Sequence, residues 1–410
     1  MDYAALMDLV SRMGTRLISS GAETYRVEET ISRILAAYGQ EGRVYCVPNS
    51  LFITIRIPDK LPFTQLCRIP MRTNDIDTVE RYNSLSRRIC TEVPDLSVAL
   101  EWVQETEDLR KLYSYPMNLM GHILVASGFC YFFGGNLADC LCAAACGLFL
   151  GIVCHFLSRL EANNFFQQIS AAFLMSGFAY TLAHWGLSRN IDTVVIGTLM
   201  LLVPGLLFTN AMRDVMYGDT NSGLNRVVLV LLIAVAIALG TAAALGISTD
   251  LWGSPVNEGL ANYGPVMLNI GCFIGCIGFS IYYNIHGPGI LICTIGGILT
   301  WSTYLLALHL GIGVIYANFI GGIVASVYAE TMARIRRFPA ISYLVVSLFP
   351  LLPGAGIYYA MAYAVENEMT SFAQKGFQTA AIAGALALGI LLVSTAFRIY
   401  SNYRMKKRTA

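Results

Sequence analysis

The chain has 410 residues, of which 56% are apolar and 13% charged, and its formal net charge is +1. This composition excludes an ordinary soluble domain, of which about a quarter is charged, and it indicates a membrane protein with several spans. Eleven cysteines are present, most of them single residues inside apolar runs, so we expect no disulfide framework, metal site or cofactor.

The first part of the chain is polar. Of the 53 Asp, Glu, Lys and Arg residues, 30 lie before position 116. The first twenty residues include Asp2, Asp8, Arg12 and Arg16 and have no uninterrupted apolar core, which argues against a cleaved signal peptide. We therefore expect residues 1–115 to form a cytoplasmic α+β domain.

Residue periodicity predicts the elements of this domain. The pattern gives helices over 6–17, 27–38, 75–89 and 96–112, and strands over 51–57 and 63–70. Between the first two helices, Ser20 precedes Glu23 by three residues, a spacing that predicts an N-terminal capping pair. The alternative is that Glu23 or Thr24 contacts a substrate.

Ten apolar stretches follow, each close to the roughly 20 residues that cross a bilayer. They cover 116–134, 137–158, 165–185, 191–209, 226–247, 262–283, 288–309, 312–333, 340–363 and 376–398. With the N-terminal domain in the cytoplasm, eleven Lys and Arg residues of the connecting segments and tail lie inside, against Arg189 and Lys375 outside. The sequence therefore predicts a multi-pass protein of the cytoplasmic (inner) membrane, with both termini cytoplasmic.

Two of these stretches share an interruption. LLVPGLLFTNAMRD at 201–214 and LFPLLPGAGIYYAM at 348–361 each contain a Pro-Gly pair, and Pro353 follows Pro204 by 149 residues. The offset predicts two five-span halves, 116–250 and 251–410. Because five is odd, the second half enters the membrane from the opposite face, as in the inverted repeats of many secondary transporters.

Pro at the start of a helix loses no hydrogen bond, so Pro204-Gly205 and Pro353-Gly354 are expected to begin new half-helices. In inverted halves, the positive ends of the two half-helices face each other, which suits the carboxylate of an amino acid or a small organic acid. Asn210 and Tyr358 or Tyr359 are then expected near the path. The alternative is a plain proline kink in each span.

Few polar side chains lie in the spans, so each is a candidate for coupling or gating. Asp139 is the proton-carrier candidate by elimination, with a helix-capping role as the alternative. Arg213-Asp214 and Asp219 form a polar turn that could close an inner gate or be a solvated loop. Glu330 is a further candidate, and its alternative is an i, i+4 pair with Arg334.

Three stretches resemble the threonine/serine exporter family. They are LLVPGLLFTNAMRDVMYGDTNSGLNR, SGAETYRVEETISRILAAYG and ARIRRFPAISYLVVSLFPLLPGAGIYYAM, and the last resembles a part that some members encode separately. The resemblance covers nearly the whole chain. It implies a single-chain exporter of small amino acids driven by the proton gradient, with relatives assigned to dicarboxylate export.

Four functional interpretations follow. The first is a proton-coupled threonine or serine exporter that works by alternating access. The others are an exporter of a small dicarboxylate such as succinate, a passive channel, and a membrane-anchored sensor, which ten spans disfavour. The sequence has no HExxH, no paired intramembrane aspartates and no nucleophile elbow, so an enzyme is not expected. The expected partners are the small substrate, protons and lipid, without nucleic acid, and an oligomer is compatible with the sequence.

Overall fold

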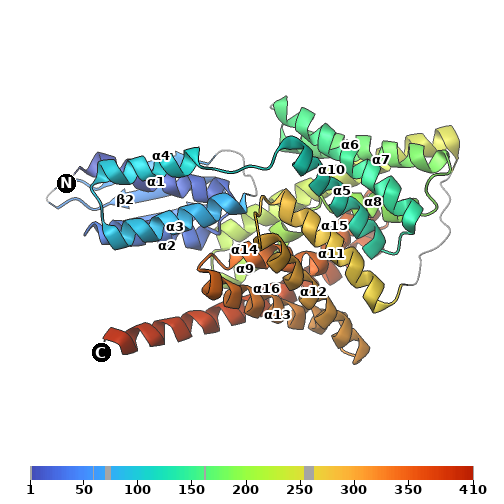
Figure 1. Cartoon of the computed structure of the whole chain (residues 1–410). Coiled ribbons are helices and arrows are strands. Elements are labelled where there is room, and N and C mark those ends of the chain that lie inside the picture. Colours follow the sequence, from blue (N-terminus) through green and yellow to red (C-terminus); the bar gives the residue numbers. More distant parts are fainter. Residues whose placement is uncertain (1, 59, 70–74, 161–162, 254–262, 410) are drawn as a thin grey trace. The chain divides into compact units, whose positions relative to one another are not determined.

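The structure is a computed structural model that describes residues 2–58, 60–69, 75–160, 163–253 and 263–409 (Figure 1). The chain divides into two compact units. The first comprises Met1–Tyr113, Tyr283–His286 and Met332–Ser342, and the second comprises Ser114–Tyr282, Gly287–Thr331 and Tyr343–Ala410.

The first unit combines helices with a small sheet. Its elements are α1 (Tyr3–Ser19), α2 (Thr24–Ala37), β1 (Gly42–Val47), β2 (Ser50–Ile55), β3 (Phe63–Arg68), α3 (Ile76–Glu92) and α4 (Leu96–Asp108). The strands form an antiparallel sheet in the order β1-β2-β3. The predicted alternation of β2 is confirmed, because Leu51, Ile53 and Ile55 are fully buried. Gly14 lets α1 approach this core closely, since a Cβ there would lie 2.5 Å from Leu51 and 2.7 Å from Ile31.

Three details of this unit differ from the sequence-based expectations. Strand β1 was not predicted, because only Cys46 of its six residues is buried and its alternation is weak. Helix α4 ends at Asp108 and not at position 112. The predicted capping pair is wrong: Ser20 is the C-cap of α1, and Glu23, at the N-cap of α2, makes no capping hydrogen bond and pairs with Arg26 at 3.1 Å.

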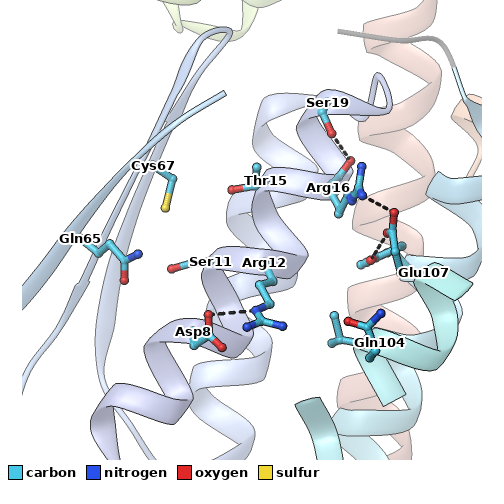
Figure 2. Close-up of a pocket in the computed structure, with 12 residues that line it drawn as sticks. Asp8, Ser11, Arg12, Thr15, Arg16, Ser19, Gln65, Cys67, Gln104 and Glu107 are labelled. Carbon is cyan, nitrogen blue, oxygen red and sulfur yellow. Dashed lines mark hydrogen bonds and ion pairs between the residues drawn. The ribbon is translucent and has the colours of Figure 1, made fainter. Parts of the chain in front are cut away.

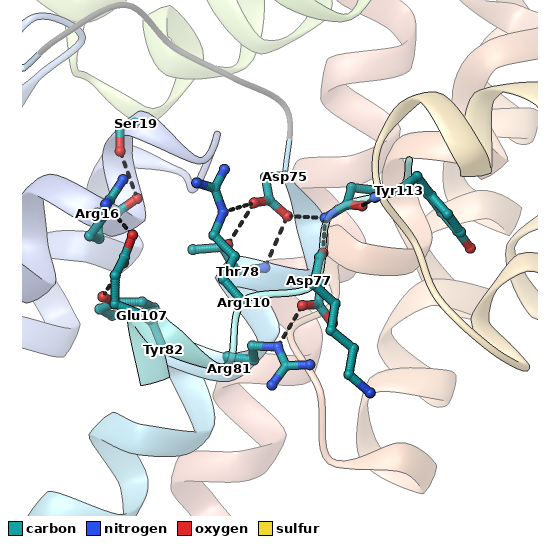
Figure 3. A network of polar contacts seen from close by, with 12 residues as sticks. Arg16, Ser19, Asp75, Asp77, Thr78, Arg81, Tyr82, Glu107, Arg110 and Tyr113 are labelled. Carbon is teal, nitrogen blue, oxygen red and sulfur yellow. Dashed lines mark hydrogen bonds and ion pairs between the residues drawn. The ribbon is translucent and has the colours of Figure 1, made fainter. Parts of the chain in front are cut away.

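A buried carboxylate ties the loop Tyr283–His286 into the first unit (Figure 3). Asp75 accepts hydrogen bonds from the Asn284 amide at 2.7 Å, the Thr78 hydroxyl at 2.6 Å and Arg110 Nε at 2.8 Å. Burial alone would raise the pKa of Asp75, but these hydrogen bonds outweigh it and lower the pKa. The carboxylate therefore stays charged at neutral pH and holds the loop.

The second unit consists of helices alone among its described residues. They are α5 (Tyr115–Phe132), α6 (Leu137–Arg159), α7 (Asn164–His184), α8 (Ile191–Leu199), α9 (Gly205–Tyr217), α10 (Thr220–Trp252), α11 (Pro265–Tyr282), α12 (Gly289–His309), α13 (Val314–Arg336, whose last turn lies in the first unit), α14 (Ile341–Leu348), the short 3-10 helix η1 (Phe349–Leu351), α15 (Gly354–Val365) and α16 (Met369–Thr409). The order repeats: corresponding helices of α5–α10 and α11–α16 begin 149 to 152 residues apart.

The protein is a multi-span helical membrane protein. Six described helices are long and apolar enough to cross a membrane, namely α6, α10, α11, α12, α13 and α16. A seventh candidate is the pair formed by Ile341–Leu351 and α15, which is bent by 50° at the break. Each of the ten predicted stretches coincides with a helix or a broken helix, but α5, α7 and the α8–α9 pair fall outside that set.

Glycines bring equivalent helices of the two halves together. At Gly128 of α5, a Cβ would lie 2.5 Å from the backbone nitrogen of Gly275 on α11. At Gly278 of α11, a Cβ would lie 2.6 Å from the nitrogen of Val125. Small residues at these positions let two membrane helices pack backbone to backbone.

Candidate functional site

The two Pro-Gly pairs break their helices in the same way. Pro204 has φ −83° and ψ 45° and is the N-cap of α9, and Pro353 has φ −77° and ψ 39° and is the N-cap of α15. The new helices begin at Gly205 and Gly354, one residue after the position expected from the sequence. Both spans are therefore interrupted, as the Pro-Gly pairs predicted.

Both breaks contain a tight turn. The Gly205 N–H donates to the Val203 carbonyl at 2.9 Å, and the Gly354 N–H donates to the Leu352 carbonyl at 2.8 Å. A bond to the second residue back, with the torsion angles of the prolines, is an inverse γ-turn. The first amide of each half-helix is thus occupied within its own turn.

The two breaks lie against each other. A Cβ built on Gly205 would lie 3.1 Å from Leu352 Cβ and 3.3 Å from the backbone nitrogen of Gly354. A Cβ built on Gly354 would lie 3.0 Å from a methyl carbon of Val203 and 3.9 Å from the sulfur of Met200. Segments 149 residues apart in sequence therefore meet where both helices begin.

Each half-helix leaves two further amides without an intrahelical partner. In α9 these belong to Leu206 and Leu207, because the first intrahelical bond runs from Phe208 N to Pro204 O. In α15 they belong to Ala355 and Gly356. Two helix N-termini thus bring four amide donors and two positive dipole ends to one region, an arrangement that can bind a carboxylate.

An apolar cluster packs beside these helix starts. It consists of buried Val230, Ala234 and Ile357, and of the partly buried residues Leu207, Phe208 and Met361. Its members come from α9, α10 and α15. An anion held at the amides would therefore lie next to apolar side chains, where charge–dipole attraction is stronger than in water.

The predicted contact residues Asn210, Tyr358 and Tyr359, together with Thr209, which was not predicted, occupy equivalent places on the two half-helices. Thr209 and Asn210 lie in α9, and Tyr358 and Tyr359 lie in α15, 149 residues later. Asn210 and Tyr358 are half-buried, Tyr359 is 37% exposed, and the tyrosine rings are 5.4 Å apart. Thr209 is 1% exposed, and its hydroxyl has no hydrogen-bond partner among the described residues.

Three tyrosines interact with Asp192, which is one of the few acidic residues in the predicted spans. Asp192, exposed in the first turn of α8, interacts electrostatically with Tyr180 of α7 and with Tyr358 and Tyr359 of α15. Tyr358 also shares a hydrogen bond with Thr241 of α10. Four helices thus contribute to one polar cluster beyond the start of α15.

A buried ion pair joins α9 and α10. Asp214 Oδ2 lies 2.9 Å from Arg226 Nε, with side chains 10% and 7% exposed. These two atoms attract by charge and are not aligned as a hydrogen bond. Arg213 is buried as well, and Asp219 caps α10 by accepting from Ser222 N at 3.3 Å. Of the two interpretations given to this segment, the burial favours a closed polar contact over a solvated loop.

Asp139 lies at the start of α6 and is fully buried. It forms a capping box with Asn136, and it accepts from the Ser188 hydroxyl at 2.9 Å, from the backbone of Arg189 and Asn190 at 2.8 and 3.0 Å, and from the Asn190 amide at 3.1 Å. The contact with Asn136 is that of the capping alternative, the other contacts hold the segment before α8, and the coupling role stays a prediction. Glu330 is half-buried on α13, four residues before Arg334, and its role also stays a prediction.

Sequence comparison identifies the family to which the chain belongs. Residues 8–248 match the family described as "Putative threonine/serine exporter", and residues 269–396 match the family described as "Threonine/Serine exporter, ThrE". The first match alone covers more than half of the chain. The chain belongs to the threonine/serine exporter family. The first match ends within α10 and the second begins within α11, the helix at which the order of helices begins again.

Two named relatives of the exporter family align with nearly the whole chain. A "Threonine/serine exporter" of Corynebacterium glutamicum is 24% identical and aligns over 95% of this chain and 82% of its own length. A "Probable threonine/serine exporter" of Mycobacterium tuberculosis (strain ATCC 25618 / H37Rv) is 23% identical over 94% of this chain and 75% of its own length. No solved structure matches the chain.

Sequence reasoning missed two residues of this candidate site and the surroundings of a third. Arg226 lies twelve residues after Asp214 across the Gly218 turn, so its pairing depends on how α9 and α10 pack. Thr209 could have been found from its position, because it occupies in the first half the place of Tyr358 in the second. Asp192 was visible as an acidic residue in an apolar stretch, but the tyrosines that surround it come from distant helices.

Proposed function

We propose that the protein is a proton-coupled secondary transporter that exports threonine, serine or a similarly small amino acid by alternating access. The observation that carries this proposal is the contact between the two Pro-Gly breaks, which brings two helix N-termini together. Family membership supports the substrate class. The amides after Gly205 and Gly354 hold the substrate carboxylate, and the apolar cluster accommodates a small side chain.

The proposed topology has ten crossings in two inverted halves. Its support is the repeated order of helices, with the α8–α9 and α14–α15 pairs broken at equivalent positions. An odd number of crossings in each half makes the second half enter from the opposite face. The excess of Lys and Arg residues in the segments on one side supports a cytoplasmic location of both termini.

The inner gate is the polar segment after the first break. Arg213, Asp214 and Asp219 lie there, and the buried pair of Asp214 with Arg226 fastens α9 to α10. Opening toward the cytoplasm separates or hydrates this pair, because two buried charges regain solvation when water enters. Asn210 and Thr209 lie between this gate and the break.

The proton carrier has to exchange protons with water during the cycle. Asp139 accepts five hydrogen bonds, one from Asn136 in the capping box of α6 and four from residues 188–190, and protonation would weaken them. Asp192 is exposed and lies among tyrosines, two of which belong to the broken helix α15. We therefore assign the proton-carrying role to Asp192 and the structural role to Asp139.

Counterflow in proteoliposomes tests the substrate assignment. Vesicles loaded with unlabelled threonine should take up labelled threonine and serine, and labelled succinate should not exchange. Exchange of succinate without threonine would establish the dicarboxylate alternative. Protein-free vesicles and vesicles with the Gly354→Leu variant are the matched controls.

A further inference from the structure

A polar groove of about 600 Å³ lies in the first unit (Figure 2). One face of α1 forms its floor, and β3 and α4 form its walls. Its volume falls in the range of about 300–1,000 Å³ that is usual for small-molecule sites. The residues that line it are Asp8, Ser11, Arg12, Thr15, Arg16, Ser19, Gln65, Cys67, Tyr82, Val103, Gln104 and Glu107.

The groove has equal numbers of basic and acidic side chains. Arg12 Nε donates to Asp8 at 3.0 Å, and Arg16 Nη2 pairs with Glu107 of α4. The Tyr82 hydroxyl donates to the other oxygen of Glu107 at 3.0 Å, which fixes that carboxylate in place. Two guanidinium groups and two carboxylates therefore face one space, and a ligand without net charge matches them better than a dianion does.

The guanidinium groups retain donors for a ligand. Each uses one nitrogen in the described side-chain contacts, Nε in Arg12 and Nη2 in Arg16, although a guanidinium carries five N–H groups. The two residues lie four apart on α1, so their side chains leave the same face of the helix. They can accept one carboxylate between them while each keeps its own acidic partner.

One buried hydroxyl of the groove lacks a partner. Ser11 is 6% exposed, and among the described residues nothing hydrogen-bonds its Oγ. An unsatisfied buried polar group destabilises the folded state, and a hydrogen bond from a ligand hydroxyl or ammonium group would offset that cost. Thr15 lines the groove one turn further along α1 and offers a second hydroxyl.

We propose that this groove binds a free α-amino acid as its zwitterion. Arg12 and Arg16 hold the carboxylate, Asp8 and Glu107 hold the ammonium group, and Ser11 bonds the polar end of a small side chain. That the ligand is the transported threonine or serine rests on the proposed function. The groove then serves as a second, non-transport site through which the amino acid to be exported regulates the exporter.

Cys67 provides a direct probe, because its half-buried thiol lines the groove. The full chain in detergent is alkylated with N-ethylmaleimide, and modification of Cys67 and Cys90 is followed by peptide mass spectrometry. Threonine at ten times its dissociation constant should slow alkylation of Cys67 about elevenfold, as one-site mass action requires. Cys90, which is also half-buried but does not line the groove, should react at an unchanged rate.

Ligand analogues test the zwitterion. Threonine amide lacks the carboxylate and N-acetylthreonine lacks the ammonium group, so neither should protect Cys67, and succinate should not either. Equal protection by any of these three compounds would overturn the assignment. Arg12→Gln should raise the threonine concentration needed to protect Cys67 by at least about tenfold, since it removes a charge-assisted hydrogen bond to the carboxylate.

Arg33→Gln is the matched control, because Arg33 forms the same i, i+4 ion pair with Glu29 on α2, outside the groove. It should leave the protection unchanged. Threonine counterflow is measured on the same wild-type preparation. Counterflow without protection of Cys67 would overturn the groove assignment alone, and protection without counterflow would overturn the proposed transport function alone.

Discussion

Substitution of the glycines in the two breaks should reduce transport in proportion to the volume added. A methyl group on Gly205 would lie 3.1 Å from Leu352 Cβ, and one on Gly354 would lie 3.0 Å from Val203, so neighbours would have to move by a few tenths of an ångström. Alanine should therefore cost about 1 kcal/mol, or roughly fivefold in substrate affinity. Leucine adds three more carbon atoms and should cost up to about 3 kcal/mol, or about 150-fold.

The assay is threonine counterflow per reconstituted molecule, with the apparent affinity measured separately from the maximal rate. Gly177→Leu and Gly246→Leu are matched controls, because both glycines lie inside helices of the second unit and a Cβ there would meet no atom within 4 Å. The controls should transport normally. Normal affinity in Gly205→Leu and Gly354→Leu proteins that elute as folded species would refute the reasoning, since the breaks would then lie outside the binding site.

Three further predictions concern charged groups. Asp192→Asn should abolish the threonine accumulation that a pH gradient drives, while threonine exchange continues. Asp139→Asn should mainly lower thermal stability. The reverse pattern would assign the coupling role to Asp139. A double-mutant cycle on Asp214 and Arg226, measured by thermal unfolding, should give a coupling energy in the upper part of the range of about 0.5–3 kcal/mol for residues in contact. Additive effects of the two substitutions would contradict the buried ion pair. Burial raises the pKa of Glu80 from 4.5 to about 7. The folded state then keeps a proton that the unfolded state has lost, so stability should fall by at most about 3 kcal/mol as the pH rises from 4.5 to 7. Glu80→Gln should remove this fall, and an unchanged difference between melting temperatures at pH 5 and pH 8 would show that Glu80 is not its source.

The helices of the second unit could be predicted from the sequence because the length of the apolar stretches and the Pro-Gly pairs within them determine where helices form and break. Each predicted stretch begins or ends within a few residues of a helix, and both Pro-Gly pairs mark breaks. Local rules were less successful in the first unit. Ser20 and Glu23 have the spacing of a capping pair, but Ser20 ends α1, because the chain turns at Gly21 with φ 96° before α2 begins.

Contacts between distant elements could not be predicted from spacing. Arg226 meets Asp214, and Glu107 meets Arg16, only because their helices pack side by side. Asp139 is a further example, because four of the five hydrogen bonds that it accepts come from Ser188, Arg189 and Asn190, in the segment before α8. The residues of these ion pairs and hydrogen bonds can be read in the sequence, but the tertiary structure determines which of them pair.

The central claim is that this chain uses a proton gradient to move a small amino acid, and accumulation in proteoliposomes tests it most directly. Vesicles with the wild-type chain are given equal threonine on both sides, and a pH gradient is then imposed. The account predicts that threonine accumulates above its equilibrium level on one side and that a protonophore abolishes the accumulation. Threonine that equilibrates rapidly but never exceeds equilibrium under any gradient would contradict the account and establish a passive channel.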